Sequence, residues 1–186
     1  MTTGILVLAA GFSRRFGNDK RRAQLADGRS LLIASIEAAQ ASGLPVRVCL
    51  RPGDAALAAQ VEQTGVVIIY CQNAHRGMGA TLAEGVNQCA DWDALLVALG
   101  DMPHIRSDSY RRVAHALAEA PICRPVYRGE SGHPVGFTSS LFPELQGLQG
   151  DAGARSVIQR HAGKVRSIAL DDPGIVYDVD FPANLD

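Results

Sequence analysis

Apolar runs alternate along most of the chain with segments whose apolar residues recur at helical spacing. The run Ile5–Ala10 is continuous, ends at Gly11 and lacks the alternation of a strand with one wet face. It therefore predicts a central strand that is buried on both faces of a sheet. Further apolar or β-branched runs also predict strands. They are Val46–Leu50, Val66–Tyr70, Ala94–Leu99, Ile122–Tyr127, Val135–Thr138, Val165–Leu170 and Ile175–Val179.

Helices are predicted between these strands, with boundaries taken from capping residues and from glycines that end the helical pattern. The predicted helices are one capped by Ser30 and ended by Gly43, Ala55–Gln63 capped by Asp54, one opened by Gly77-Met78-Gly79 and running through Val86, one from Ser107 to about Ala120, and one capped by Asp151 and reaching His161. Strands joined through helices pair in parallel, whereas the turn residues Arg128–Gly132 predict a hairpin. The pattern predicts an α/β fold with helices on both faces of a mixed, mostly parallel sheet.

Length and composition narrow the class of protein. The 186 residues are 47% hydrophobic and 20% charged, which predicts one globular domain over residues 1–186. The net charge of −1 argues against nucleic-acid binding, and every apolar run is far shorter than the roughly 18 residues that cross a membrane. The N-terminus has no secretory signal pattern, so a cytoplasmic protein is expected. The four cysteines lie at least 18 positions apart and predict buried thiols.

Three segments leave predicted strands at their carboxyl ends, where α/β sheets bind ligands. They are Gly11–Lys20, Gly100–Pro103 and Asp178–Pro182. The first leads into five cations, namely Arg14, Arg15, Lys20, Arg21 and Arg22. Backbone amides next to glycine and the charges of Arg and Lys bind phosphate groups, although the spacing matches neither the P-loop nor Gly-x-Gly-x-x-Gly. The segment is interpreted as a phosphate-binding loop, with a solvated basic loop as the alternative.

The other two segments carry carboxylates. Asp101 lies at the exit of a buried strand, and Asp178 and Asp180 share one side of an extended chain. One or two such carboxylates suffice for Mg²⁺, which keeps water and substrate phosphates as its other ligands. A turn before Pro103 and a solvated acidic terminus are the alternatives. Two histidines are further candidates for the same crevice, His104 and His133.

The motif Leu8-Ala9-Ala10-Gly11-x-Ser13-x-Arg15-x-Gly17-x-x-Lys20 occurs together with Gly100-Asp101-Met102-Pro103. This pair resembles the MobA-like nucleotidyltransferase family, and within it the molybdenum cofactor cytidylyltransferase branch. The resemblance continues at Gly77–Leu82, Gly132–Phe137, Gly150–Arg155 and Asp178–Pro182, and so covers nearly the whole chain. Two segments depart from the family pattern. Relatives more often have apolar residues and proline at Arg21–Leu25, and Thr-Pro-Glu-Asp is usual at Phe181–Asn184.

The resemblance implies a Rossmann-like three-layer sandwich of the nucleotide-diphospho-sugar transferase type. The nucleotide-binding residues that it implies are Leu8, Ala9, Ala10, Gly11, Ser13, Arg14, Arg15, Lys20, Gly77, Gly79, Thr81 and Gly100. Arg15, Lys20 and Asp101 would be catalytic, with Asp101 and Asp180 holding Mg²⁺. The residues expected to bind the acceptor are His133, Asp151 and Arg155, although position alone would make Arg155 a solvated surface residue.

The implied activity is Mg-dependent transfer of CMP from CTP to a phosphorylated acceptor, with release of pyrophosphate. The expected acceptor is molybdopterin, and the expected recipient of the product is an apo-molybdoenzyme or its chaperone. Ala9-Ala10-Gly11 is similar to the cytidylyltransferase form of the loop, since guanylyltransferases of molybdenum cofactor assembly tend to have a second glycine in place of Ala10. The alternatives are transfer from another nucleotide such as GTP, transfer to a sugar phosphate, and nucleotide binding without transfer.

Overall fold

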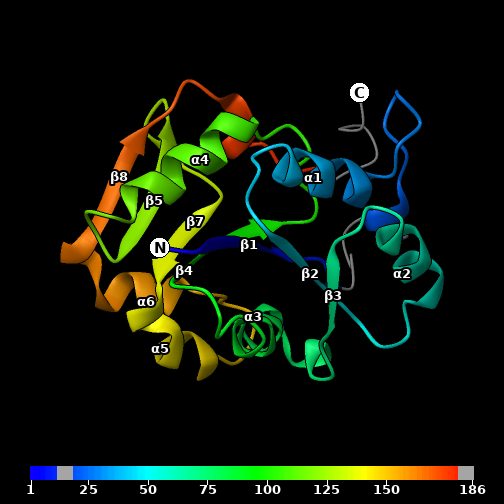
Figure 1. Cartoon of the computed structure of the whole chain (residues 1–186), viewed down its shortest axis with the longest axis horizontal. Helices are drawn as coiled ribbons and strands as arrows, with labels where there is room; N and C mark the ends of the chain where they lie inside the picture. The colour runs from blue at the N-terminus through cyan, green and yellow to red at the C-terminus, as the bar shows by residue number, and fades with distance from the viewer. Residues whose placement is uncertain (12–18, 180–186) are drawn as a thin grey trace.

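The computed structural model describes residues 1–11 and 19–179, whose strands form one eight-stranded sheet (Figure 1). The strands are β1 Thr3–Leu8, β2 Val46–Leu50, β3 Val67–Tyr70, β4 Ala94–Leu99, β5 Ile122–Tyr127, β6 Glu130–Ser131, β7 Val135–Thr138 and β8 Val165–Ala169. Their order is β3-β2-β1-β4-β7-β5-β6, and β8 pairs with β5. The pairs β1–β2, β1–β4, β2–β3 and β5–β8 are parallel, whereas β4–β7, β5–β7 and β5–β6 are antiparallel. The predicted mixed, mostly parallel sheet is confirmed.

The α-helices cover both faces of the sheet, which gives three layers (Figure 1). Helices α1 Leu31–Gln40, α2 Ala55–Glu62 and α4 Ser107–Ala116 pack on one face, and α3 Met78–Asn87, α5 Phe142–Gln146 and α6 Arg155–Arg160 pack on the other. In β1, Ile5 and Val7 belong to the first of these cores, whereas Leu6 and Leu8 belong to the second. This explains the unbroken apolar run. The 3-10 turns are η1 Lys20–Arg22, η2 Ala74–Arg76, η3 Ser139–Leu141, η4 Ala162–Lys164 and η5 Pro173–Ile175.

Some element boundaries differ from the sequence prediction. β1 ends at Leu8, and the next two residues continue as a buried loop. The helix that begins at Ser107 ends at Ala116, short of Ala120, because the following amides bond to carbonyls only three residues back. Helix α5 was not predicted. Its five residues are too few to show a helical period, and its first turn contains Pro143. In the part of the chain that the structure describes, no helix is long and apolar enough to span a membrane.

One predicted helix cap is wrong, and a second is confirmed in position but not in its hydrogen bond. Asp151 does not cap α6, which begins at Arg155, because Gly153 has a φ of +54° that an α-helix cannot contain. Asp54 stands at the N-cap position of α2, but its carboxylate makes no capping hydrogen bond. That carboxylate accepts hydrogen bonds from Arg21 and Arg51 instead. A charged partner from elsewhere in the chain thus replaces the local cap.

The segment predicted as a strand over Ile175–Val179 is not a strand. The carbonyl of Ile175 accepts a hydrogen bond from the His133 amide (2.8 Å), and the Val179 amide donates to the Asp101 carbonyl (3.0 Å). These backbone groups therefore bond to two loops, at the exit of β4 and the entry of β7, and not to a neighbouring strand. Gly174 permits the close approach, since a Cβ there would lie 2.1 Å from the His104 carbonyl oxygen.

Asp172 anchors this C-terminal segment to α4. Its side chain is 3% exposed and accepts hydrogen bonds from the Arg106 amide (2.9 Å), the Ser109 hydroxyl (2.6 Å) and the Gly174 amide (3.0 Å). The carboxylate thereby satisfies the first turn of α4 and starts η5 at the same time. The anchor holds the start of the segment that leads to Val179.

Asp172→Ala is expected to lower the free energy of unfolding by about 3 kcal/mol, because three donors, two of them in buried hydrogen bonds, lose their acceptor. Urea denaturation followed by circular dichroism measures the change. Asp171→Ala is the matched control, since that neighbouring side chain is exposed, and its effect should stay within about 0.5 kcal/mol. Equal effects of the two substitutions would contradict the anchoring role of Asp172.

Candidate functional site

The carboxyl ends of β1 and β4 lie next to each other and bring two predicted motifs together. The Gly100 amide donates to the Leu8 carbonyl at 3.0 Å. A Cβ on Gly100 would lie 2.9 Å from Cδ1 of Leu32 and 3.1 Å from Cβ of Ala9, so glycine permits this approach. Asp101 therefore leaves β4 beside the point where the chain leaves β1.

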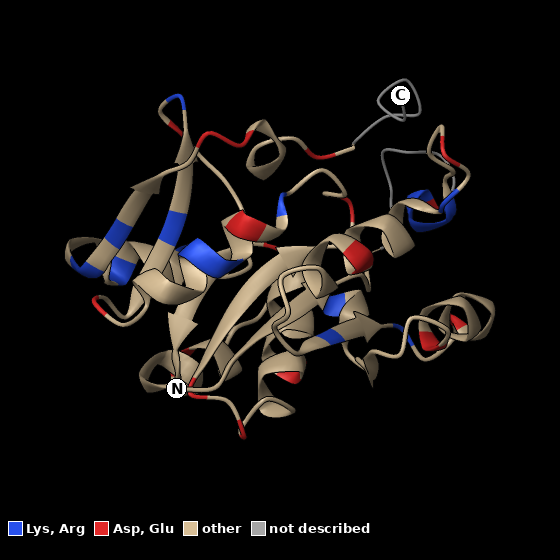
Figure 2. Cartoon of the chain, turned by 45° about the horizontal axis from the view of Figure 1, so that its top comes forward, with Lys and Arg blue, Asp and Glu red and all other residues tan. Residues whose placement is uncertain are grey.

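An ion pair between Lys20 and Asp101 forms the centre of the site. Nζ of Lys20 lies 2.5 Å from Oδ2 of Asp101, and the two side chains are 18% and 16% exposed. Nζ is also 3.4 Å from the carbonyl oxygen of Val179, whose amide binds the Asp101 carbonyl. Lys20 belongs to η1, a turn of three basic residues near this edge of the sheet (Figure 2). Three segments far apart in sequence therefore meet at the carboxyl ends of the strands.

The second oxygen of Asp101 is available for another cation. Oδ1 is buried and has no hydrogen-bond partner among the described residues. A buried carboxylate oxygen without a partner is costly, and oxygen is the ligand that Mg²⁺ prefers. Within residues 1–11 and 19–179, no group of three or more His, Cys, Asp and Glu residues could hold a metal ion. Asp101 fits an ion that takes one or two protein carboxylates and completes its shell with water and phosphate.

His133 faces the same carboxylate from the entry of β7. Its amide donates to the Ile175 carbonyl, which ties it to the C-terminal segment. Burial lowers the pKa of His133, and the negative charge of Asp101 only partly opposes this shift. Burial therefore favours the neutral form of the imidazole.

Stability should fall as the pH drops through the ordinary pKa of histidine, about 6.5. The pKa of His133 is lower in the folded state, so acid protonates the unfolded chain first and favours it. His133→Gln cannot take up this proton and should flatten the decline in urea midpoint between about pH 7 and pH 5. His115→Gln, on the exposed side of α4, is the control that should keep the decline. An unchanged decline in His133→Gln would mean that other groups cause it.

The Gly77–Gly79 motif packs against the loop before α6. Gly77 has a φ of +110°, and a Cβ there would lie 2.5 Å from both Oδ1 of Asp151 and the Gly150 carbonyl oxygen. The Gly79 amide donates to that carbonyl at 2.7 Å. Thr81 is buried one turn later in α3, where its hydroxyl lies 3.4 Å from the Gly77 carbonyl oxygen. The two glycines are thus required by close backbone packing, which brings Asp151 to the amino end of α3.

The remaining predicted site residues have the following places. Leu8, Ala9 and Ala10 are buried at the end of β1, and Gly11 is exposed after them. Arg155 is exposed at the start of α6, in agreement with the solvated interpretation of its position. The predicted residues that lie outside the described part of the chain are Ser13, Arg14, Arg15 and Asp180. Asp180 directly follows Val179, the residue that contacts both Asp101 and Lys20.

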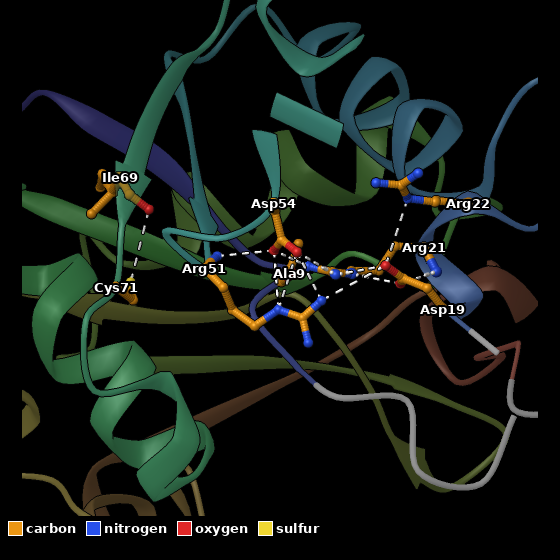
Figure 3. Close-up of polar contacts among 8 residues, drawn as sticks. All are labelled: Ala9, Asp19, Arg21, Arg22, Arg51, Asp54, Ile69 and Cys71. Atoms are coloured by element: carbon orange, nitrogen blue, oxygen red, sulfur yellow. Dashed lines mark hydrogen bonds and ion pairs between the residues drawn. The ribbon is translucent and has the colours of Figure 1, made fainter. Parts of the chain in front are cut away.

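Arg21 is a residue of the site that the sequence did not single out from its basic neighbours. It is 4% exposed and lies among Asp19, Asp54 and the Ala9 carbonyl (Figure 3). Burial alone would lower the pKa of Arg21, but hydrogen bonds to Asp19 and Asp54 raise it above its usual value. Its charge is therefore neutralised inside the protein and does not add to a phosphate-binding surface. The one sequence signal was the departure from the family pattern at Arg21.

Comparison with known proteins places the chain among nucleotidyltransferases. The family model of the MobA-like NTP transferase domain matches residues 5–165. The purine catabolism protein PucB of Bacillus subtilis (strain 168) is 31% identical over an alignment of 192 positions, which covers 96% of this chain and 92% of PucB.

Solved structures show the same arrangement of elements. Rv0371c from Mycobacterium tuberculosis H37Rv superposes with a TM-score of 0.87 and 26% identity, over 98% of this chain and 94% of Rv0371c. A structure of the Rv0371c complex with manganese superposes with a TM-score of 0.78 and 23% identity, over 91% of this chain and 89% of that one.

Proposed function

Because this chain belongs to the MobA-like NTP transferase domain family, we propose that it transfers CMP from CTP to a phosphorylated acceptor, and that this acceptor is molybdopterin. Its fold is of the nucleotide-diphospho-sugar transferase type. The observation that carries the proposal is the meeting of Lys20, Asp101 and Val179 at the carboxyl ends of β1 and β4. A cation, a carboxylate with an unpartnered oxygen and the chain leading to Asp180 are groups that a nucleoside triphosphate and its metal require.

Asp101 and Asp180 would hold the divalent metal, for which we propose Mg²⁺. The unpartnered Oδ1 of Asp101 supports this assignment, and the manganese complex of the relative Rv0371c is consistent with a divalent ion. A bound ion would act there as a Lewis acid and balance charge on the phosphoryl oxygens.

The chain's own residues would bind and orient the substrates. A terminal phosphate oxygen of the acceptor attacks the α-phosphorus of CTP in line, the bond to the bridging oxygen of the β-phosphate breaks, and pyrophosphate leaves. The attacking phosphate is already ionised near pH 7, since its second pKa is about 6, so the step requires no strong general base. Lys20 and Arg15 would stabilise the charge on the triphosphate, which makes positioning and electrostatics the main contributions to the rate.

The substrate preferences depend on different parts of the site. Ala10, in place of a second glycine, favours CTP over GTP by the family pattern. Gly77, Gly79 and Thr81 at the start of α3 would bind the nucleotide. His133, Asp151 and Arg155 would contact the acceptor. His133 supports this assignment because the charge of Asp101 acts on it and burial lowers its pKa, which favours a neutral imidazole that can donate or accept hydrogen bonds.

The test is incubation of the purified protein with Mg²⁺, one ribonucleoside triphosphate at a time and molybdopterin. The product is identified by mass, and pyrophosphate is measured alongside. The expected result is the cytidylylated acceptor with CTP and little product with the other nucleotides. Equal turnover of GTP would contradict the base assignment, and pyrophosphate released only with a sugar phosphate would contradict the acceptor. If the protein bound Mg-CTP tightly but released no pyrophosphate with any acceptor, its function would be nucleotide binding without transfer.

A further inference from the structure

We propose that Arg21 and Asp54 form a positioning pair that holds Lys20 against Asp101 and so sets the geometry of the triphosphate site. Lys20 and Arg21 are consecutive residues of η1, so a displacement of one displaces the other. The kinetic consequence of this inference rests on the proposed function. Its structural part concerns the placement of Lys20 and can be tested without any nucleotide.

All the hydrogen-bonding capacity of Arg21 is used within the protein. A guanidinium has five N–H donors. Nε and Nη2 donate to the two oxygens of Asp19 (both 2.7 Å), Nη1 and Nη2 donate to the two oxygens of Asp54 (2.5 and 2.9 Å), and Nη1 also donates to the Ala9 carbonyl (2.8 Å). Five contacts therefore occupy five donors. Arg21 acts as a positioning residue, because none of these donors is left for a phosphate oxygen.

Asp54 supplies the fixed end of the pair. It lies in the loop between β2 and α2 and is 7% exposed. Besides Arg21, it binds the amide of Arg51 (3.1 Å) and Nη2 of the same residue (2.8 Å). These contacts, drawn in Figure 3, fix the carboxylate to the end of β2. Arg21 therefore connects η1 to two strand ends at once, that of β2 through Asp54 and that of β1 through Ala9.

Lys20 needs such a connection because η1 is short. In the described chain, the two backbone hydrogen bonds within η1 are local, from the Arg22 amide to the Asp19 carbonyl and from the Ala23 amide to the Lys20 carbonyl. The Leu31 amide also donates to the carbonyl of Ala23, the C-cap residue of η1, at 2.8 Å, which ties the turn to the start of α1. None of these bonds reaches the strand ends where Asp101 lies. The side chain of Arg21 supplies contacts to the sheet edge on which Asp101 lies. A shift of about 1 Å in a charged group is enough to change a rate on the order of 100-fold.

Lysine acetylation tests the placement directly, since the chain has only two lysines, Lys20 and Lys164. Lys20 is paired with Asp101 and partly buried, whereas Lys164 is exposed and gives an internal reference. The protein is treated with a dilute acetylating ester, and the modification rate of each lysine is measured by peptide mass spectrometry. Asp101→Asn calibrates the rate of a Lys20 whose ion pair with Asp101 has been removed.

Arg21→Met is expected to raise the acetylation rate of Lys20 several-fold relative to Lys164, towards the rate in Asp101→Asn. Arg21→Lys keeps the charge but cannot make all five contacts, so it should change the rate in the same direction by less. The matched control is Asp91→Asn, which removes the partner of a similar two-bond pair with Arg47 at the opposite end of β2. That control should leave the Lys20 rate unchanged.

Two results would overturn the proposal. One is an unchanged Lys20 rate in a folded Arg21→Met protein, and the other is an equal rise at Lys164, which would report general loosening. If Arg21→Met does not fold, Asp54→Asn is compared with Asp91→Asn in the same way. The outcome does not depend on turnover, so a protein that fails to use CTP still tests the positioning pair.

Kinetics provide a second readout that a purely structural role would not move. Arg21→Met should raise the KM for CTP on the order of 10-fold while leaving the KM for the acceptor within about twofold. In a Lys20→Gln background the same substitution should have little further effect, because Arg21 acts through Lys20. Effects that simply add would show that Arg21 acts on the site by another route.

Discussion

Asp101→Asn is expected to lower kcat/KM for nucleotidyl transfer about 1000-fold, which corresponds to roughly 4 kcal/mol of transition-state stabilisation. The substitution keeps the shape of the side chain but removes the negative charge that pairs with Lys20. The substitution also makes Oδ1, the oxygen of Asp101 that is buried without a hydrogen-bond partner among the described residues, a weaker ligand for a metal ion. Both the metal and the triphosphate should therefore bind in a less productive geometry. The measurement is the initial rate of pyrophosphate release with saturating acceptor.

Metal binding separates this role of Asp101 from a merely structural one. Titration with Mn²⁺, followed by electron paramagnetic resonance in the presence of CTP, should show much weaker binding to Asp101→Asn than to the wild-type protein. Asp27→Asn is the matched control, since Asp27 is also paired with a cation, Arg29, but on the exposed surface. It should leave both metal binding and turnover unchanged. Wild-type turnover by Asp101→Asn would remove Asp101 from the mechanism.

The central sheet could be predicted from sequence because burial on both faces of a strand requires a continuous run of apolar residues. In β1 and β4, nearly every residue meets apolar neighbours, so the apolar run is continuous and easily seen. The segment Ile175–Val179 has a similar composition but a different structure. Its backbone bonds to His133 and Asp101, and no local pattern shows that these loops lie nearby. Apolar composition predicted a strand there and could not show that its backbone would bond to two loops instead.

Some residues of the site could also be predicted from the sequence, and others could not. The rule that ligands bind at the carboxyl ends of parallel strands brought Lys20 and Asp101 together, although 81 positions separate them in sequence. The role of Arg21 did not follow from that rule, because a buried guanidinium and a phosphate-binding one have the same sequence signature. The carboxylate of Asp54, 33 positions away, is what makes Arg21 a buried, paired guanidinium. The local sequence pattern predicted only that Asp54 caps a helix. Long-range pairs of charged groups are where sequence reasoning was insufficient.

Lys20→Gln should change nucleotide and metal binding in opposite directions. Loss of the ammonium group should weaken CTP binding and lower kcat/KM about 100-fold, because a charge that stabilises the triphosphate is removed. In the absence of nucleotide, the same substitution should tighten Mn²⁺ binding, since Lys20 is the cation that now balances Asp101 at 2.5 Å. Isothermal titration calorimetry measures both affinities on one protein.

Lys164→Gln is the control for Lys20→Gln because it removes the chain's other lysine from an exposed turn. Both affinities should remain at the wild-type level in that variant. If Lys20→Gln weakened CTP and Mn²⁺ alike, the ion pair would be a structural support for the site and not a competitor for its metal. Opposite signs are expected if Lys20 and the metal share the carboxylate of Asp101, as we propose.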